Sequence, residues 1–75
     1  MELVKTGFTL GRGQDIHMGD LLRSSLTHDV VVMWNSVLNI FIVKIINEDI
    51  WFPLDEFISS WGSHLEIVKN ILVYE

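Results

Sequence analysis

The sequence contains no cysteine, and this absence excludes several kinds of chemistry within its 75 residues. No disulfide can form, and neither a thiolate zinc site nor a cysteine nucleophile can be built. Side-chain packing must therefore supply the stability. Ordering a chain costs about 1.5 kcal/mol per residue, and a core of this size exceeds that cost by only a few kcal/mol.

Basic residues are also scarce. Five Lys and Arg stand against ten Asp and Glu, which gives a net charge of −5. This field repels phosphate backbones, and no basic cluster interrupts it, so we expect no nucleic-acid ligand. A protein that mimics nucleic acid and occupies a basic groove stays open as a weaker alternative, because the five basic residues offset half of the acids.

A long uninterrupted apolar run is missing as well. The richest window, Val30–Ile46, is broken by Asn35, Ser36, Asn39 and Lys44, and is shorter than the roughly 20 apolar residues that cross a bilayer. The first five residues lack the charged-then-apolar layout of a signal peptide. We therefore expect no membrane span and a cytoplasmic protein.

What the sequence has in excess is apolar side chain. Hydrophobic residues make up 49% of it, and the mean hydropathy is +0.37. A domain this small has little interior, so part of the apolar surface should stay exposed. Such a surface typically marks self-association or a partner protein.

Three apolar segments in the middle of the chain predict an antiparallel meander. Val30–Trp34 and Ile40–Ile46 are nearly continuous β-branched runs, and Asn47–Asp49 has the turn chemistry that returns the chain into Ile50–Phe52. Three strands need a cover on one face to be stable.

A helix near residues 53–62 is the predicted cover. Pro53 suits its first turn and Gly62 its C-terminal cap, while Asp55 and Glu56 lie near its positive end. Apolar residues recur at the spacing i, i+3, i+4 and i+7, at Leu54, Phe57, Ile58 and Trp61.

The remaining segments are less regular. Residues 1–10 favour a short extended segment, and the glycine-containing residues 11–15 a surface loop. Met18–Leu22 suits a strand or a helical turn, and residues 65–75 suit a strand, with a helix as the alternative. The fold class predicted is α+β: one domain over residues 1–75, with a small antiparallel sheet of three to five strands covered by one short amphipathic helix.

The order of these parts resembles the permuted papain-like hydrolases of the NlpC/P60 superfamily, including its YiiX-like and LRAT-like branches. The motifs that carry the resemblance are Gly19-Asp20-Leu21-Leu22, Leu26-Thr27-His28 leading into Val30-Val31-Val32, and Pro53-Leu54-Asp55-Glu56-Phe57. The resemblance covers roughly residues 19–75 and implies His28 as the general base. The family's nucleophilic cysteine is missing, which implies a truncated or reused half of the fold, or a subunit completed by a partner.

Catalytic and metal-binding patterns are weak elsewhere. His28 and Asp29 are adjacent on an expected strand, where neighbouring side chains point to opposite faces, so they are not naturally a dyad. Ser24 and Ser25 lack the surroundings of an activated nucleophile. Asp15, His17 and Asp20 fit no metal-ligand spacing and are interpreted as solvated loop residues. We expect no metal and no cofactor.

The predicted binding surface consists of aromatic residues flanked in the sequence by acidic residues. Aromatic anchors inside a polar rim are common at protein interfaces. Trp51 fits a core position equally well, and the acids also suit a turn and a helix start. The predicted interface residues are Trp34, Asp49, Trp51, Phe52, Asp55 and Glu56.

We therefore predict a non-enzymatic protein-interaction module, an inhibitor or adaptor that acts as a homodimer or bound to another protein. Compact acidic proteins of this size are often regulators encoded by bacteria or phages, an association that agrees with this function. The alternative is the remnant or partner-completed subunit of a papain-like cysteine hydrolase, with His28 as its relic base.

Overall fold

The structure, a computed structural model, describes residues 3–11, 13–25 and 28–72. It contains a five-stranded antiparallel sheet, a separate two-stranded sheet and one short helix, which confirms the predicted α+β class. The elements in chain order are β1 (Lys5–Thr9), β2 (Asp15–His17), β3 (Asp20–Arg23), β4 (Val30–Asn35), β5 (Ile40–Ile45), β6 (Trp51–Pro53), α1 (Leu54–Trp61), the 3-10 turn η1 (Gly62–His64) and β7 (Glu66–Asn70).

The large sheet has the strand order β6-β5-β4-β3-β7. Its centre is the predicted meander, in which Met33 of β4 lies opposite Ile42 of β5, and Val43 of β5 lies opposite Phe52 of β6. Of the predicted segment 65–75, residues Glu66–Asn70 form β7, a strand that pairs antiparallel with β3, and residues 73–75 lie outside the described part of the chain. The β3–β7 register shifts between Leu21 and Leu22, so this pair carries a bulge.

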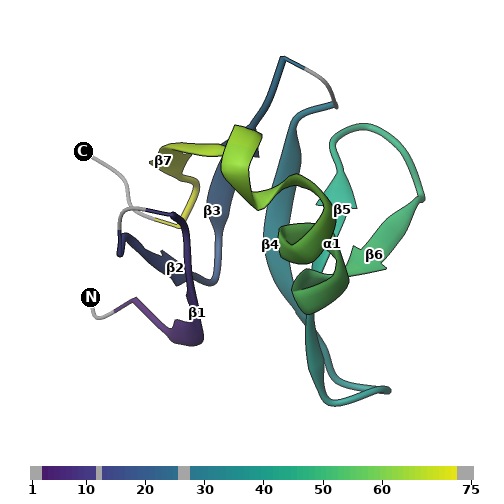
Figure 1. Ribbon diagram of the computed structural model, residues 1–75. Helices are drawn as coiled ribbons and strands as arrows, with labels where there is room; N and C mark the ends of the chain where they lie inside the picture. Colours follow the sequence, from purple (N-terminus) through teal and green to yellow (C-terminus); the bar gives the residue numbers. More distant parts are fainter. Residues whose placement is uncertain (1–2, 12, 26–27, 73–75) are drawn as a thin grey trace.

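The hydrophobic core lies on one face of this sheet. Leu54 and Phe57 of α1 pack there, together with Leu10 and Ile16 from the β1–β2 hairpin. Figure 1 shows α1 lying across the sheet and the hairpin beside β3. The sheet residues that complete the core are Leu22, Val30, Val32 and Val43.

Three local predictions differ from the structure. Pro53 closes β6, and α1 begins one residue later, at Leu54. Gly62 does follow α1, but its φ of −54° is right-handed, because the chain continues into the 3-10 turn instead of stopping in a left-handed cap. Asp15–His17 is a strand, because it pairs with β1 and buries Ile16 completely.

Within the described ranges, no helix combines the length and the apolar composition that crossing a membrane requires.

Candidate binding surfaces

A shallow hollow of about 420 Å³ opens where the start of α1 meets the β4–β5 hairpin. Trp34 and Phe41 lie directly opposite each other on these strands, and their rings meet edge-to-face with centroids 4.8 Å apart. Such cross-strand aromatic pairs stabilise a sheet and hold both rings in fixed positions. The residues that line the hollow are Phe8, Trp34, Asn39, Ile40, Phe41, Pro53, Asp55 and Glu56.

Asp55 and Glu56 place two carboxylates at the rim of this hollow. Both side chains are exposed, and within the described residues neither takes part in an ion pair. Asp55 Oδ1 accepts a hydrogen bond of 2.8 Å from the backbone N–H of Glu56. The two carboxylates lie near the positive end of the helix, where negative charge is stabilising. Both remain exposed to solvent.

A second hollow continues past Glu56 along α1. Phe52 and Phe57 stack at its base with ring centroids 6.3 Å apart, and Ser60 and Trp61 complete its lining. Both hollows share Glu56, so they form one continuous surface. We call it the helix surface, and its defining residues are Phe8, Trp34, Phe52, Asp55 and Glu56.

The chemistry of the helix surface suits apolar and cationic groups. Aromatic faces attract Lys and Arg side chains, and carboxylates beside them add direct ion pairing. Exposed aromatic rings that are already fixed by packing make effective anchors at protein interfaces.

The opposite face of the sheet is a second, partly exposed surface, on which Leu21, Val31 and Ile42 are buried to 6%, 8% and 7% exposure. The core residues of α1 and the β1–β2 hairpin pack on the other side, while Ile71 lies beside Val31 and Met33 on this one. Met33 and Trp51 are 43% and 42% exposed there. We call it the open sheet face, and the strand registers assign to it Leu21, Arg23, Val31, Met33, Ile42, Lys44, Trp51, Glu66 and Lys69.

The charge of the open sheet face differs from that of the whole protein. Lys44 lies opposite both Val31 and Trp51, and Lys69 lies opposite Leu21, so both lysines have apolar cross-strand neighbours. Neither lysine forms an ion pair with any residue that the structure describes.

The predicted interface residues divide between these surfaces. Trp34, Phe52, Asp55 and Glu56 come together on the helix surface. Trp51 lies on the open sheet face, because it follows the alternation that puts Phe52 on the helix side. Asp49 is exposed in the connection between β5 and β6 and lines neither hollow.

Sequence reasoning missed Phe8, Phe41 and Lys44. The alternation of side chains along β4 and β5 could have found Phe41 and Lys44, since it separates the two faces of each strand. Phe8 carries no such signal, because its position depends on how the β1–β2 hairpin folds back.

His28, the base that the resemblance implies, is exposed and precedes β4, where it lines a surface hollow with Asp29, Ile46 and Asn47. Asp29 is engaged by Arg23, whose Nη2 lies 3.0 Å from Asp29 Oδ2 and whose Nε lies 3.2 Å from Oδ1. These hydrogen bonds lower the pKa of Asp29 against a smaller opposing effect of desolvation. The site thus places the imidazole of His28 near an ionised carboxylate. Ser24, which directly follows β3, is buried.

The cluster of Asp15, His17 and Asp20, interpreted above as solvated loop residues, is corrected by the structure. Asp15 forms an ion pair of 3.4 Å with Lys5 across the hairpin, and Asp20 is only 3% exposed. Among the described residues, no three His, Asp or Glu side chains converge as a metal site would require.

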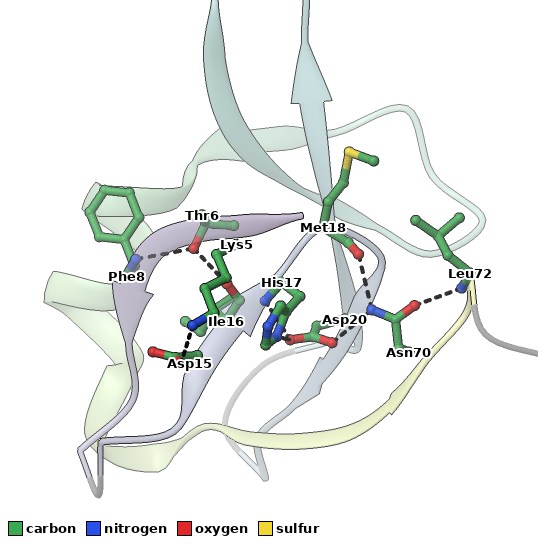
Figure 2. Close-up of polar contacts among 10 residues, drawn as sticks. All are labelled: Lys5, Thr6, Phe8, Asp15, Ile16, His17, Met18, Asp20, Asn70 and Leu72. Carbon is green, nitrogen blue, oxygen red and sulfur yellow. Dashed lines mark hydrogen bonds and ion pairs between the residues drawn. The ribbon is translucent and has the colours of Figure 1, made fainter. Parts of the chain in front are cut away.

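Asp20 belongs instead to a polar network that holds β7 against β3 (Figure 2). Its Oδ2 accepts the backbone N–H of His17 at 2.8 Å, and its Oδ1 accepts Asn70 Nδ2 at 2.9 Å. Asn70 also donates to the carbonyl of Met18 and accepts the N–H of Leu72. The buried carboxylate is thus satisfied, and its role is to fix the end of the sheet.

Comparisons of the chain with protein-family models, with curated proteins and with solved structures found no match.

Proposed function

We propose that this protein is a non-enzymatic protein-interaction module whose binding site is the helix surface. The observation that carries the proposal is the joining of fixed, exposed aromatic rings with two carboxylates that have no ion pair among the described residues. The partner surface presents apolar side chains with Lys or Arg among them. Such a module acts as an inhibitor or adaptor by covering a surface of another protein chain.

The experiment compares the protein with a Trp34→Ala, Glu56→Lys variant as baits on a resin. Both residues are exposed, so the variant should keep its far-UV circular dichroism spectrum. The native bait should retain a bound protein, either from a lysate or as further copies of itself, and the variant should lose it. A Glu48→Lys bait makes the same charge change in the exposed β5–β6 connection and should bind normally.

Two outcomes contradict the proposal. One is that neither a protein from the lysate nor a second copy binds the native bait. The other is that both baits bind the same proteins equally.

A second candidate is the partner-completed subunit of a papain-like hydrolase. The exposed position of His28 at the start of β4, in a hollow with Asp29, supports it. Such a subunit needs a cysteine from another chain, which the imidazole would deprotonate. Hydrolysis reconstituted with a cysteine-bearing partner should vanish in His28→Ala, and unchanged hydrolysis would remove His28 from this role.

A further inference from the structure

We infer that the open sheet face binds the helix surface of a second copy of this chain, so that copies assemble head to tail. This inference rests on the proposed function and names its partner. Three features of the molecule support it: the charges on the two surfaces, their positions in the fold, and the area that they offer.

The charges of the two surfaces are complementary. The helix surface carries Asp55 and Glu56 beside aromatic rings, and the open sheet face carries Lys44 and Lys69 among aliphatic side chains and Trp51. None of these four charged groups has an ion-pair partner within the described residues. A contact between the surfaces buries apolar area on both and pairs the charges, which favours the correct orientation.

The position of the surfaces requires a second molecule. They lie on opposite faces of one sheet, since α1 packs over Val43 while the neighbouring Lys44 points away from the core. One chain cannot join them to each other. Two open sheet faces stacked on each other would bring lysines together, so like-with-like pairing is disfavoured and the contact is between unlike surfaces.

An interface between unlike surfaces leaves one free surface at each end of a pair. Assembly therefore continues beyond two copies, either into a ring or into an open chain. This distinguishes it from a symmetric dimer, which stops at two.

The available area predicts reversible assembly. Four spacings of about 4.8 Å between strands, and six residues rising about 3.4 Å each, give the sheet a flat footprint of roughly 400 Å². Leu21, Val31 and Ile42 are already buried within it, so the area open to a partner is smaller. Each partner of a standard stable complex buries roughly 800 Å². The assembly should therefore depend strongly on protein concentration.

The test is a charge exchange measured by sedimentation velocity over a range of concentrations. The native protein should exceed twice its monomer mass of 8.7 kDa as the concentration rises. Lys44→Glu and Glu56→Lys should each weaken association about tenfold or more, because each opposes like charges. An equimolar mixture of the two variants should recover association, since each variant then meets its complement.

Glu48→Lys is the matched control, because it makes the same charge change away from both surfaces and should associate like the native protein. The inference is overturned if the native protein stays monomeric up to about 1 mM. It is also overturned if the mass stops at two copies, or if the mixture fails to recover association.

These results separate the two proposals. A monomeric native protein that still captures a different protein through Trp34 and Glu56 overturns head-to-tail assembly and supports the proposed function. A monomeric protein that captures nothing overturns both.

Discussion

Replacing Gly19 by alanine should destabilise the fold strongly, because two separate effects meet at this position. Its φ is +90°, where an L side chain costs about 1–2 kcal/mol. A Cβ there would also lie 2.6 Å from Leu72 Cγ and 3.0 Å from Asn70 Oδ1. Relieving such overlap in a packed site typically costs about 1–3 kcal/mol more. We therefore expect Gly19→Ala to lower the free energy of unfolding by about 2–5 kcal/mol.

Gly7→Ala is the matched control. Its φ is +87°, nearly the same, but nothing lies within 4 Å of the added Cβ. It should cost only the backbone share, about 1–2 kcal/mol. Urea unfolding followed by far-UV circular dichroism gives both values.

A third comparison isolates the contact with Leu72. In a Leu72→Ala background, most of the overlap is gone, so Gly19→Ala should cost little more than Gly7→Ala does. Equal costs for Gly19→Ala and Gly7→Ala in the native background would refute the reasoning, as would an unchanged Gly19→Ala cost without the Leu72 side chain.

Three further changes test other parts of the structure by urea unfolding. Asn70→Asp should place a second carboxylate about where Nδ2 now lies 2.9 Å from Asp20 Oδ1, and the repulsion should destabilise the protein at pH 7. Protonation removes the repulsion, so the deficit should shrink as the pH is lowered; a deficit independent of pH would contradict this account. Arg23 lowers the pKa of Asp29 from its ordinary 3.8, so the pair stabilises the fold above that pH and stops doing so as the pH falls through the lower folded value. The advantage of the native protein over Asp29→Asn should thus hold at neutral pH and fade as the pH falls below about 4; a difference that grows in acid would contradict this account. Leu54→Ala should cost about 2–5 kcal/mol, because Leu54 is completely buried between α1 and the sheet, and a cost below about 1 kcal/mol would show that α1 contributes little to the core.

The sequence predicted the meander and the helix because their signals are local. Val30–Val32 and Ile40–Ile45 are β-branched runs whose conformation depends little on distant contacts, and Leu54 and Phe57 lie at helical spacing beside a proline. The place of β7 beside β3 was not predictable in this way. It depends on contacts far apart in the chain, such as the hydrogen bond between Asn70 and Asp20.

The candidate binding surfaces were predicted by residue type but not by face. Trp51 and Phe52 are neighbours in a strand, so their side chains diverge, and grouping them by proximity in the sequence joined two separate surfaces. The burial of Asp20 was likewise not predictable from the neighbouring sequence. Its burial follows from Asn70 and from the N–H of His17, and nothing near Asp20 in the sequence marks it as internal.

The bulge between β3 and β7 has a consequence for aggregation. One outer strand, β7, is irregularly paired, and the other, β6, is three residues long and ends in Pro53, which has no N–H to donate. Neither border therefore presents a long, flat row of backbone groups that could template an added strand. The large sheet thus offers few backbone groups for amyloid-like stacking, and its contacts with other chains are left to the side chains on its broad sides.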